Sequence, residues 1–301
     1  MSFFERYRHH ITLHIIILIW GFTGILGKVI TIPYYSIVIY RMGIAFLALL
    51  IYLLITKKPF EKSLKKIAIF ILVGILVGAH WATFFQAIKV SNVSVTLTTL
   101  ASTSFFVAFL EPLFFKRKII WYEVLFGLLV VIGLYLIFSF EAKYKIGIVL
   151  ALISAFLAAI FSVVNGRLII QSTASQITLY EMLGGVLGIS VYTYFFEDVI
   201  IGAFSPTYLD VFYLLILGII CTAVAFVVSV SVMKILSPFT VSVSINMEPI
   251  YAIILALLLF GESEKMTLGF YFGAALILST VIGNGLLKSY FKKRKQINIK
   301  A

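Results

Sequence analysis

Apolar residues along this chain fall into ten blocks, most of them about 20 residues long, with short polar segments between them. A helix of about 20 apolar residues crosses the ~30 Å hydrocarbon core of a bilayer. Because backbone groups in lipid must be hydrogen-bonded internally, runs of this length predict helices and not strands. The expected spans cover residues 11–31, 34–56, 66–88, 92–115, 120–140, 145–170, 175–196, 209–233, 238–260 and 267–287.

Composition supports the same fold class. Of the 301 residues 62% are hydrophobic and only 12% are charged, and the mean hydropathy is +1.13. Soluble domains carry about 25% charged residues, so this chain has too few to cover a water-exposed surface. No connection between spans is long enough to fold into a soluble domain. We therefore expect an all-α integral membrane protein with ten transmembrane helices.

The net charge of +12 follows the expected topology and does not indicate a nucleic-acid partner. With the N-terminus inside, most basic residues fall in cytoplasmic segments, and Arg41 lies within a span. The outer connections hold only Lys28, Lys89, Lys143, Lys145 and Lys265. This asymmetry is the positive-inside rule, which predicts a multi-pass plasma-membrane protein (the bacterial inner membrane) with both termini cytoplasmic. Residues 289–301 form a basic cytoplasmic tail suited to anionic lipid heads.

The second half of the chain echoes the first. The stretch "AIKVSNVSVTLTTLASTSFFVAFLEPLFFKRK" (87–118) aligns with "VMKILSPFTVSVSINMEPIYAIILALLLFGES" (232–263). We expect one repeat at 1–140 and a second at 141–288, each with five spans. Because five is odd, the second repeat must be inverted, as in secondary transporters whose substrate site lies near midplane between the repeats.

Several stretches resemble one family of membrane proteins. They are "LIWGFTGILGKV" (18–29), "YRMGIAFLALL" (40–50), "GAHWATFFQAIKVSNVSVT" (78–96) and "MEPIYAIILALLLFGESEKMTLGFYFGAALIL" (247–278). Together they resemble EamA-type transporters of the drug/metabolite transporter superfamily. The resemblance implies export or exchange of small metabolites, often amino acids, through a cavity lined by spans 1, 3, 4, 6, 8 and 9. Ser104 and Arg117 depart from the family's usual proline and glutamate.

Glu248 is the most informative polar residue. It lies about eleven residues into the ninth span, ~16 Å deep, where a charge costs ~2.5–3.5 kcal/mol. Pro249 follows it and breaks the backbone hydrogen-bond ladder near Ile245. Two interpretations remain open: Glu248 and Asn246 border a substrate cavity, or Glu248 is buried against another helix at a proline kink.

Other polar and aromatic residues also have two interpretations. His80 either binds a substrate carboxylate or a proton, or hydrogen-bonds to a neighbouring helix. The aromatic residues line a cavity or pack, and small hydroxyls face the cavity or allow close helix packing. Asn165 is a candidate by symmetry with span one. The predicted substrate-binding set is Trp20, His80, Trp81, Phe84, Thr98, Ser102, Asn165, Asn246 and Glu248.

The remaining intramembrane charges are expected to be structural. Arg41 and Glu181 differ by ~10 Å in depth, which argues against a direct ion pair, and Arg41 is expected to snorkel outward. Glu111 is one turn from basic residues 116–118 and is expected to pair with them. Three Gly-x-x-x-Gly spacings, Gly74/Gly78, Gly184/Gly188 and Gly269/Gly273, predict close helix packing within or between protomers.

The function that these patterns favour is a secondary transporter, most simply an exporter, of small metabolites such as amino acids. It needs no cofactor, metal or catalytic residue, and its partners are a small-molecule substrate and the lipid bilayer. A membrane enzyme, or a passive channel or scaffold, is the alternative. Three of the four histidines, His9, His10 and His14, crowd near the N-terminal end of the chain, with no Asp or Cys cluster beside them. The sequence leaves a monomer or a homodimer open.

Overall fold

The structure, a computed structural model, describes residues 3–116, 118, 120–199, 201–280, 283 and 287. Within these residues every regular element is a helix, which confirms the expected fold class. The basic tail expected at 289–301 lies outside the described residues. The elements are α1 (Phe3–Val29), α2 (Tyr34–Ile55), α3 (Leu64–Val90), α4 (Val93–Leu100), α5 (Thr103–Phe115), α6 (Trp121–Phe140), η1 (Ala142–Tyr144), α7 (Lys145–Leu168), α8 (Ala174–Phe196), α9 (Tyr208–Leu215), the π-helix η2 (Ile216–Val224), α10 (Ala225–Val232), α11 (Pro238–Ile245), α12 (Glu248–Phe260), η3 (Gly261–Glu264) and a last helix, Leu268–Thr280.

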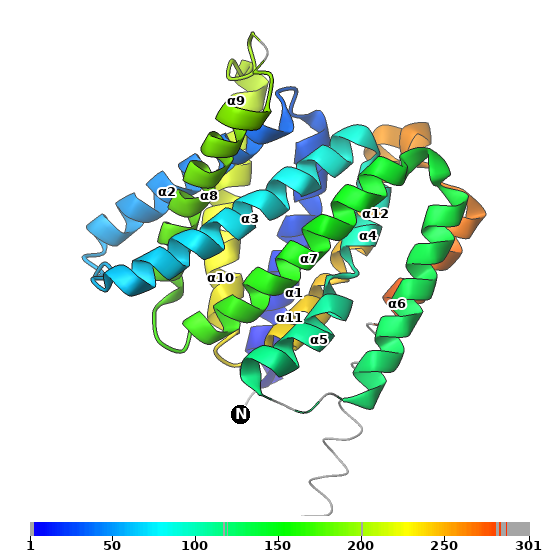
Figure 1. The fold of residues 1–301 in the computed structure, drawn as a ribbon, viewed down its shortest axis with the longest axis horizontal. Coiled ribbons are helices and arrows are strands. Elements are labelled where there is room, and N and C mark those ends of the chain that lie inside the picture. Colours follow the sequence, from blue (N-terminus) through cyan, green and yellow to red (C-terminus); the bar gives the residue numbers. More distant parts are fainter. Residues whose placement is uncertain are drawn as a thin grey trace, which may run out of the picture.

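These helices make ten consecutive crossings, because α4–α5, α9–η2–α10 and α11–α12 each form one. Eight crossings are long and apolar enough to span a membrane, and the shorter apolar helices Val124–Phe140 and Leu268–Thr280 complete the set. Short connections make neighbouring crossings antiparallel, so the five-helix halves have opposite orientations. In Figure 1, α1 and α3 finish at one end of the bundle, called here the Lys28 end, and α5 and α7 finish at the Arg167 end.

The fourth crossing of each half is a broken helix. One break separates α4 from α5 and the other separates α11 from α12. Pro249, in the first turn of α12, cannot donate to the preceding turn, as the sequence predicts. In the first half Ser104 replaces that proline, and hydroxyls take up the freed carbonyls: Thr103 Oγ1 donates to Leu100 O at 2.7 Å and Ser104 Oγ donates to Ala101 O at 3.1 Å. The break is therefore produced by a proline in the second half and stabilised by side-chain hydroxyls in the first half.

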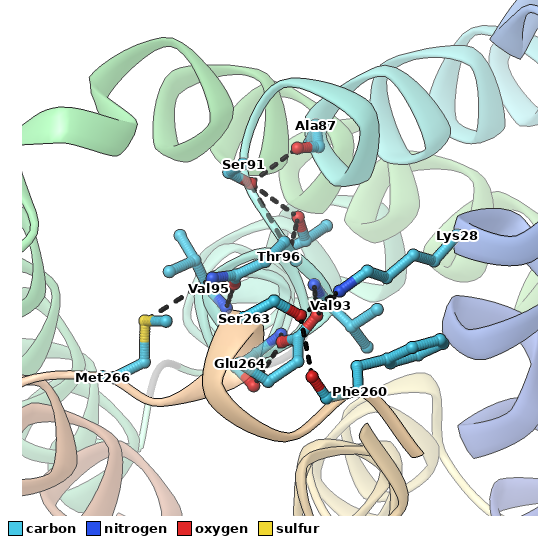
Figure 2. A network of polar contacts seen from close by, with 12 residues as sticks. Lys28, Ala87, Ser91, Val93, Val95, Thr96, Phe260, Ser263, Glu264 and Met266 are labelled. Carbon is cyan, nitrogen blue, oxygen red and sulfur yellow. Dashed lines mark hydrogen bonds and ion pairs between the residues drawn. The ribbon is translucent and has the colours of Figure 1, made fainter. Parts of the chain in front are cut away.

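The two breaks touch each other, since Asn246 Nδ2 donates to Ser104 Oγ at 2.9 Å. The start of each broken helix is held by a carboxylate from the other half. Figure 2 shows the buried Glu264 carboxylate accepting from Lys28 Nζ and Val93 N. The same carboxylate accepts from Ser94 N and Ser94 Oγ. Anionic groups are favourable at helix N-termini, because the first backbone N–H groups have no intrahelical partner.

The equivalent contact at the opposite end comes from Glu111. Its carboxylate is 5% exposed and accepts from Phe239 N, in the first turn of α11, at 2.7 Å. The sequence predicts an interfacial carboxylate at this position but not this helix cap. Each half thus stabilises the broken helix of the other.

Glycines let α3 and α8 approach at backbone distance, so the first two predicted spacings pack within one protomer. A Cβ placed on Gly74 would lie 2.1 Å from Glu181 O, and one on Gly184 would lie 2.2 Å from Ile71 O. The third spacing does the same for α6 and the last helix, which lie together at the right of Figure 1: a Cβ on Gly273 would lie 2.7 Å from Gly133 O.

Alanine at Gly74 or Gly184 is expected to lower the free energy of unfolding by about 1–3 kcal/mol, because the obstructing atoms belong to backbone and cannot turn aside. Gly43→Ala is the matched control, since no atom lies within 4 Å of a Cβ there. Thermal unfolding of the three purified variants in detergent measures the difference. Equal unfolding temperatures for all three would contradict this packing.

Candidate functional site: a cavity between the two halves

A cavity lies at the middle of the bundle and encloses about 790 Å³ of empty space, counting its mouth. Its walls come from α1, α2 and α3 in the first half, from α7, α10, α11 and α12 in the second, and from the break between α4 and α5. The polar residues among its lining are Thr23, Arg41, His80, Thr103, Ser162, Asn165, Ser229, Ser242 and Glu248.

Arg41 faces this cavity, so the expectation that it snorkels outward is wrong. The residue is 1% exposed, and its guanidinium stacks 3.7 Å from the centre of the Trp81 ring. Nε donates to Thr222 Oγ1 at 2.6 Å, whereas Nη1 has no hydrogen-bond partner. Stacking on Trp81 and the bond to Thr222 hold the cation inward and leave Nη1 available for a ligand.

The π-helix η2 places the partner of Arg41. Thr222 Oγ1 donates to Leu217 O, five residues earlier, at 2.7 Å. Gly218 allows α2 to approach, because a Cβ there would lie 3.1 Å from Arg41 O. The Cys221 carbonyl is also turned inward and accepts from Trp20 Nε1 at 3.0 Å. Single π-helical turns inside longer helices are frequent at functional sites.

Glu248 stands at the first position of α12, directly after the second break. It is 6% exposed and lines the cavity, and no described residue donates a hydrogen bond to its carboxylate. Arg41 lines the same cavity and attracts the Glu248 carboxylate electrostatically, yet the two side chains do not form an ion pair. The cavity therefore holds a buried cation and a buried carboxylate that are separated from each other.

His80 both lines the cavity and joins two helices, which fits both of its predicted interpretations. Its Nδ1 lies 3.0 Å from Ser154 O, and Ser154 Oγ donates to His80 O at 2.9 Å. We assign the Nδ1–H tautomer from this pair of bonds, so Nε2 is left as an acceptor. The contacts tie α3 to α7, one from each half.

Aromatic rings form the apolar wall of the cavity. The Trp81 and Phe226 ring centroids are 5.8 Å apart, Phe161 and Phe226 are 5.9 Å apart, and Phe161 meets His80 at 5.3 Å in an edge-to-face arrangement. Such pairs are stabilising beyond their buried area. This wall gives a bound molecule an apolar surface next to Arg41 and His80.

Six of the nine sequence-predicted site residues line the cavity: Trp20, His80, Trp81, Phe84, Asn165 and Glu248. Thr98 and Ser102 are buried away from it, and their hydroxyls have no hydrogen-bond partner. The break after α4 changes the helical phase, so Leu100 and Thr103 of that crossing face the cavity instead. Asn246 lies behind the lining, at the contact with Ser104.

The sequence analysis did not include Arg41, Thr23, Thr103, Ser162, Ser229 or Ser242 in the site. A basic residue inside a span was a signal for Arg41, but depth alone favoured snorkelling. For the hydroxyl residues, the sequence indicates only the span in which each lies and not whether its side chain faces the cavity. The described residues contain no group of three or more His, Cys, Asp or Glu suited to a metal ion.

The cavity reaches one end of the bundle more closely than the other. Asn165 is in the last turn of α7 and Met233 follows the end of α10, so the lining extends to the Arg167 end. At the Lys28 end the halves are joined by hydrogen bonds. Asp210 accepts from Thr31 N at 2.8 Å and from Thr31 Oγ1 at 2.7 Å, and Lys28 pairs with Glu264 at 2.8 Å.

Known proteins share this sequence pattern and this architecture. The sequence model of the EamA-like transporter family matches residues 9–139 and 145–286. A solved structure titled "Crystal structure of protein" shares the fold with a TM-score of 0.69, covering 94% of this chain and 98% of that chain at 14% identity. No curated protein matches significantly. Because the two family matches cover most of the chain, it belongs to the EamA-like transporter family, within the drug/metabolite transporter superfamily.

Proposed function

We propose that the protein is a secondary transporter that exports small zwitterionic metabolites, amino acids or related compounds, by alternating access. Membership in a transporter family and a central cavity between two inverted halves support transport. The observation that carries the substrate class is that Arg41 and Glu248 line one cavity without pairing with each other.

Burying an unpaired charge in a membrane protein is costly, so both groups favour a ligand that pairs with them. A substrate carboxylate fits the Arg41 guanidinium, whose Nη1 is available, because the planar fork binds carboxylates through parallel hydrogen bonds. A substrate ammonium fits the Glu248 carboxylate. Only a molecule that carries both groups satisfies both charges at once. The wall of Trp81, Phe161 and Phe226 then receives its apolar part.

Alternation between two openings requires elements with two stable arrangements. The broken helices α4–α5 and α11–α12 are the natural pivots, because their halves are already separated and meet at the Asn246–Ser104 contact. Substrate bound to Glu248 acts directly on the first residue of α12. We infer that neutralising this carboxylate helps the second break to change its angle.

Charge and cavity position together support outward transport. Basic residues concentrate in the segments expected to be cytoplasmic, which include the Arg167 end. The cavity lining extends to that end, so substrate would load from the cytoplasm. We therefore propose outward transport across the plasma membrane, the bacterial inner membrane, with both termini cytoplasmic.

Counterflow of radiolabelled ligands in proteoliposomes tests the substrate class. The panel contains one amino acid, the matching amine without the carboxylate, and the matching acid without the ammonium. Arg41→Gln should weaken binding of the amino acid and the acid but leave binding of the amine unchanged. Glu248→Gln should weaken binding of the amino acid and the amine but leave binding of the acid unchanged. Each loss should be about 10–100-fold in apparent affinity, as for a lost hydrogen bond to a charged group.

Two exposed residues supply the controls: Arg167→Gln for the cation and Glu262→Gln, at the end of the same crossing as Glu248, for the carboxylate. Both should transport all ligands as the wild type does. Thermal unfolding of each variant separates loss of binding from loss of folding. If Arg41→Gln and Glu248→Gln are folded and bind the amino acid normally, the assignment of the site is wrong.

The orientation is tested by labelling single cysteines in intact cells with a membrane-impermeant maleimide. In a Cys221→Ser background, Lys143→Cys should react from outside, whereas Lys62→Cys should react only after permeabilisation. Both side chains are exposed in loops at opposite ends of the bundle, so access depends on topology alone. The reverse pattern would refute cytoplasmic termini.

A further inference from the structure

Glu181, in the middle of α8, is a buried carboxyl group that the substrate site does not use. The residue is 0% exposed, and neither Oε1 nor Oε2 has a hydrogen-bond partner. Apart from Glu248, which lines the cavity, the other buried carboxylates of the described chain accept at least one backbone N–H; they are Glu111, Glu141, Asp210 and Glu264. Those four contacts are helix or loop caps, which Glu181 is not. Its burial therefore lacks the structural explanation that the others have.

The surroundings of Glu181 offer no counter-ion. On α2, Arg41 is held by Thr222 and Trp81, and on α3, His80 is held by Ser154. Residues 225–232 of α10 contain no charged group, and the charged side chain near the end of α7, Arg167, is exposed. No described residue forms an ion pair or a hydrogen bond with the Glu181 carboxyl.

The backbone around Glu181 also excludes water on one side. Gly74 of α3 packs directly against the Glu181 main chain, so no space is left between these helices. Thr178, one turn earlier on α8, is likewise 0% exposed, and its hydroxyl has no partner. An ionised carboxylate in such a place would be an isolated charge without donors, which is strongly unfavourable. The protonated acid is the form that this packing accommodates.

Asn165 stands between this carboxyl and the cavity. Its side-chain amide lies beside the Glu181 carboxyl, although not in hydrogen-bonding geometry, and the same side chain lines the cavity. Neither its oxygen nor its nitrogen has a partner. A small rotation of the Asn165 side chain would therefore let its amide donate to the Glu181 carboxyl. In the other orientation the carboxyl has no donor. A ligand that engages the Asn165 amide would change that rotation.

We propose that Glu181 is a proton-binding site that couples substrate export to proton entry through Asn165. In the empty cavity the carboxyl carries a proton. When substrate binds from the Arg167 end it engages Asn165, the amide turns to donate to Glu181, and the acid releases its proton to cavity water. One proton leaves as one substrate binds, and a proton from the other side returns once the substrate has left. Binding of the two is mutually opposed, which is a coupling free energy between two sites.

This inference rests on the proposed transport function, and the experiment separates the two. Counterflow, with equal pH on both sides, measures substrate exchange alone; accumulation under an imposed pH gradient measures coupling. Wild-type protein should do both, and a one-to-one exchange predicts up to about tenfold accumulation per unit of pH gradient. Glu181→Gln reproduces the shape of the neutral acid but cannot release a proton. It should keep counterflow at saturating substrate, with a weaker apparent affinity because the neutral side chain opposes substrate binding, and it should lose the response to the gradient.

A second readout follows the proton itself. Adding the amino acid to weakly buffered wild-type protein in detergent should release up to one proton per protein, measured with a pH-sensitive dye. Glu181→Gln should release none, although Glu248 and His80 are intact. Glu197→Gln, at the end of the same helix, is the matched control and should behave as wild type.

Three results would overturn the proton site while leaving transport standing. They are wild-type counterflow without a gradient response, a gradient response retained in Glu181→Gln, and dependence on a sodium gradient in place of the proton gradient. Loss of counterflow in folded Glu181→Gln at saturating substrate would also overturn it, because the residue would then serve translocation itself. Absence of counterflow in the wild type would overturn the transport function and the proton site together.

Discussion

A polar group inside a bilayer has no water to satisfy it, and this constraint governs the whole structure. The broken helices α4–α5 and α11–α12 expose backbone groups at the centre of the bundle. They are tolerated because Ser104, Thr103 and Asn246 take up the freed polar atoms, and because Glu264 and Glu111 hold the N-termini of the opposite half. Other buried polar groups lack hydrogen-bond partners: Arg41 Nη1, Asn165 and Glu248 line the cavity and Glu181 lies beside Asn165, whereas the Thr98 and Ser102 hydroxyls lie away from the cavity.

This contrast separates structural polar residues from functional ones more clearly than burial does. Glu264 and Glu248 are both almost fully buried carboxylates on the last crossings of the second half. Glu264 accepts from two backbone N–H groups and a lysine, whereas no described residue donates to Glu248. The first carboxylate completes the fold. In the proposed mechanism the second is satisfied by the substrate, which then enters the energetics of the alternating states.

Sequence patterns were sufficient to predict the fold because membrane-spanning helices are recognised by the length of their apolar runs. The internal repeat, at an offset of 145 residues, also aligned the two broken crossings. Depth and Pro249 singled out Glu248 but left open whether it borders the cavity or packs against another helix. The inward orientation of Arg41 was not predictable from the sequence, because it depends on the π-helix η2, whose Thr222 and neighbouring Trp81 hold the guanidinium. A π-helical turn has no clear sequence signature. Thr98 and Ser102 were misplaced for a similar reason, since a helix break shifts every later side chain around the axis.

The central claim is that one cavity holds a cation and an anion for the two ends of a single molecule. Calorimetric titration of the purified wild-type protein with a free amino acid, its methyl ester and its N-acetyl derivative tests this directly. The account predicts that the free amino acid binds and that blocking either end weakens binding by about 10-fold or more, because one buried charge is then left unpaired. Equal affinity for all three ligands would contradict it.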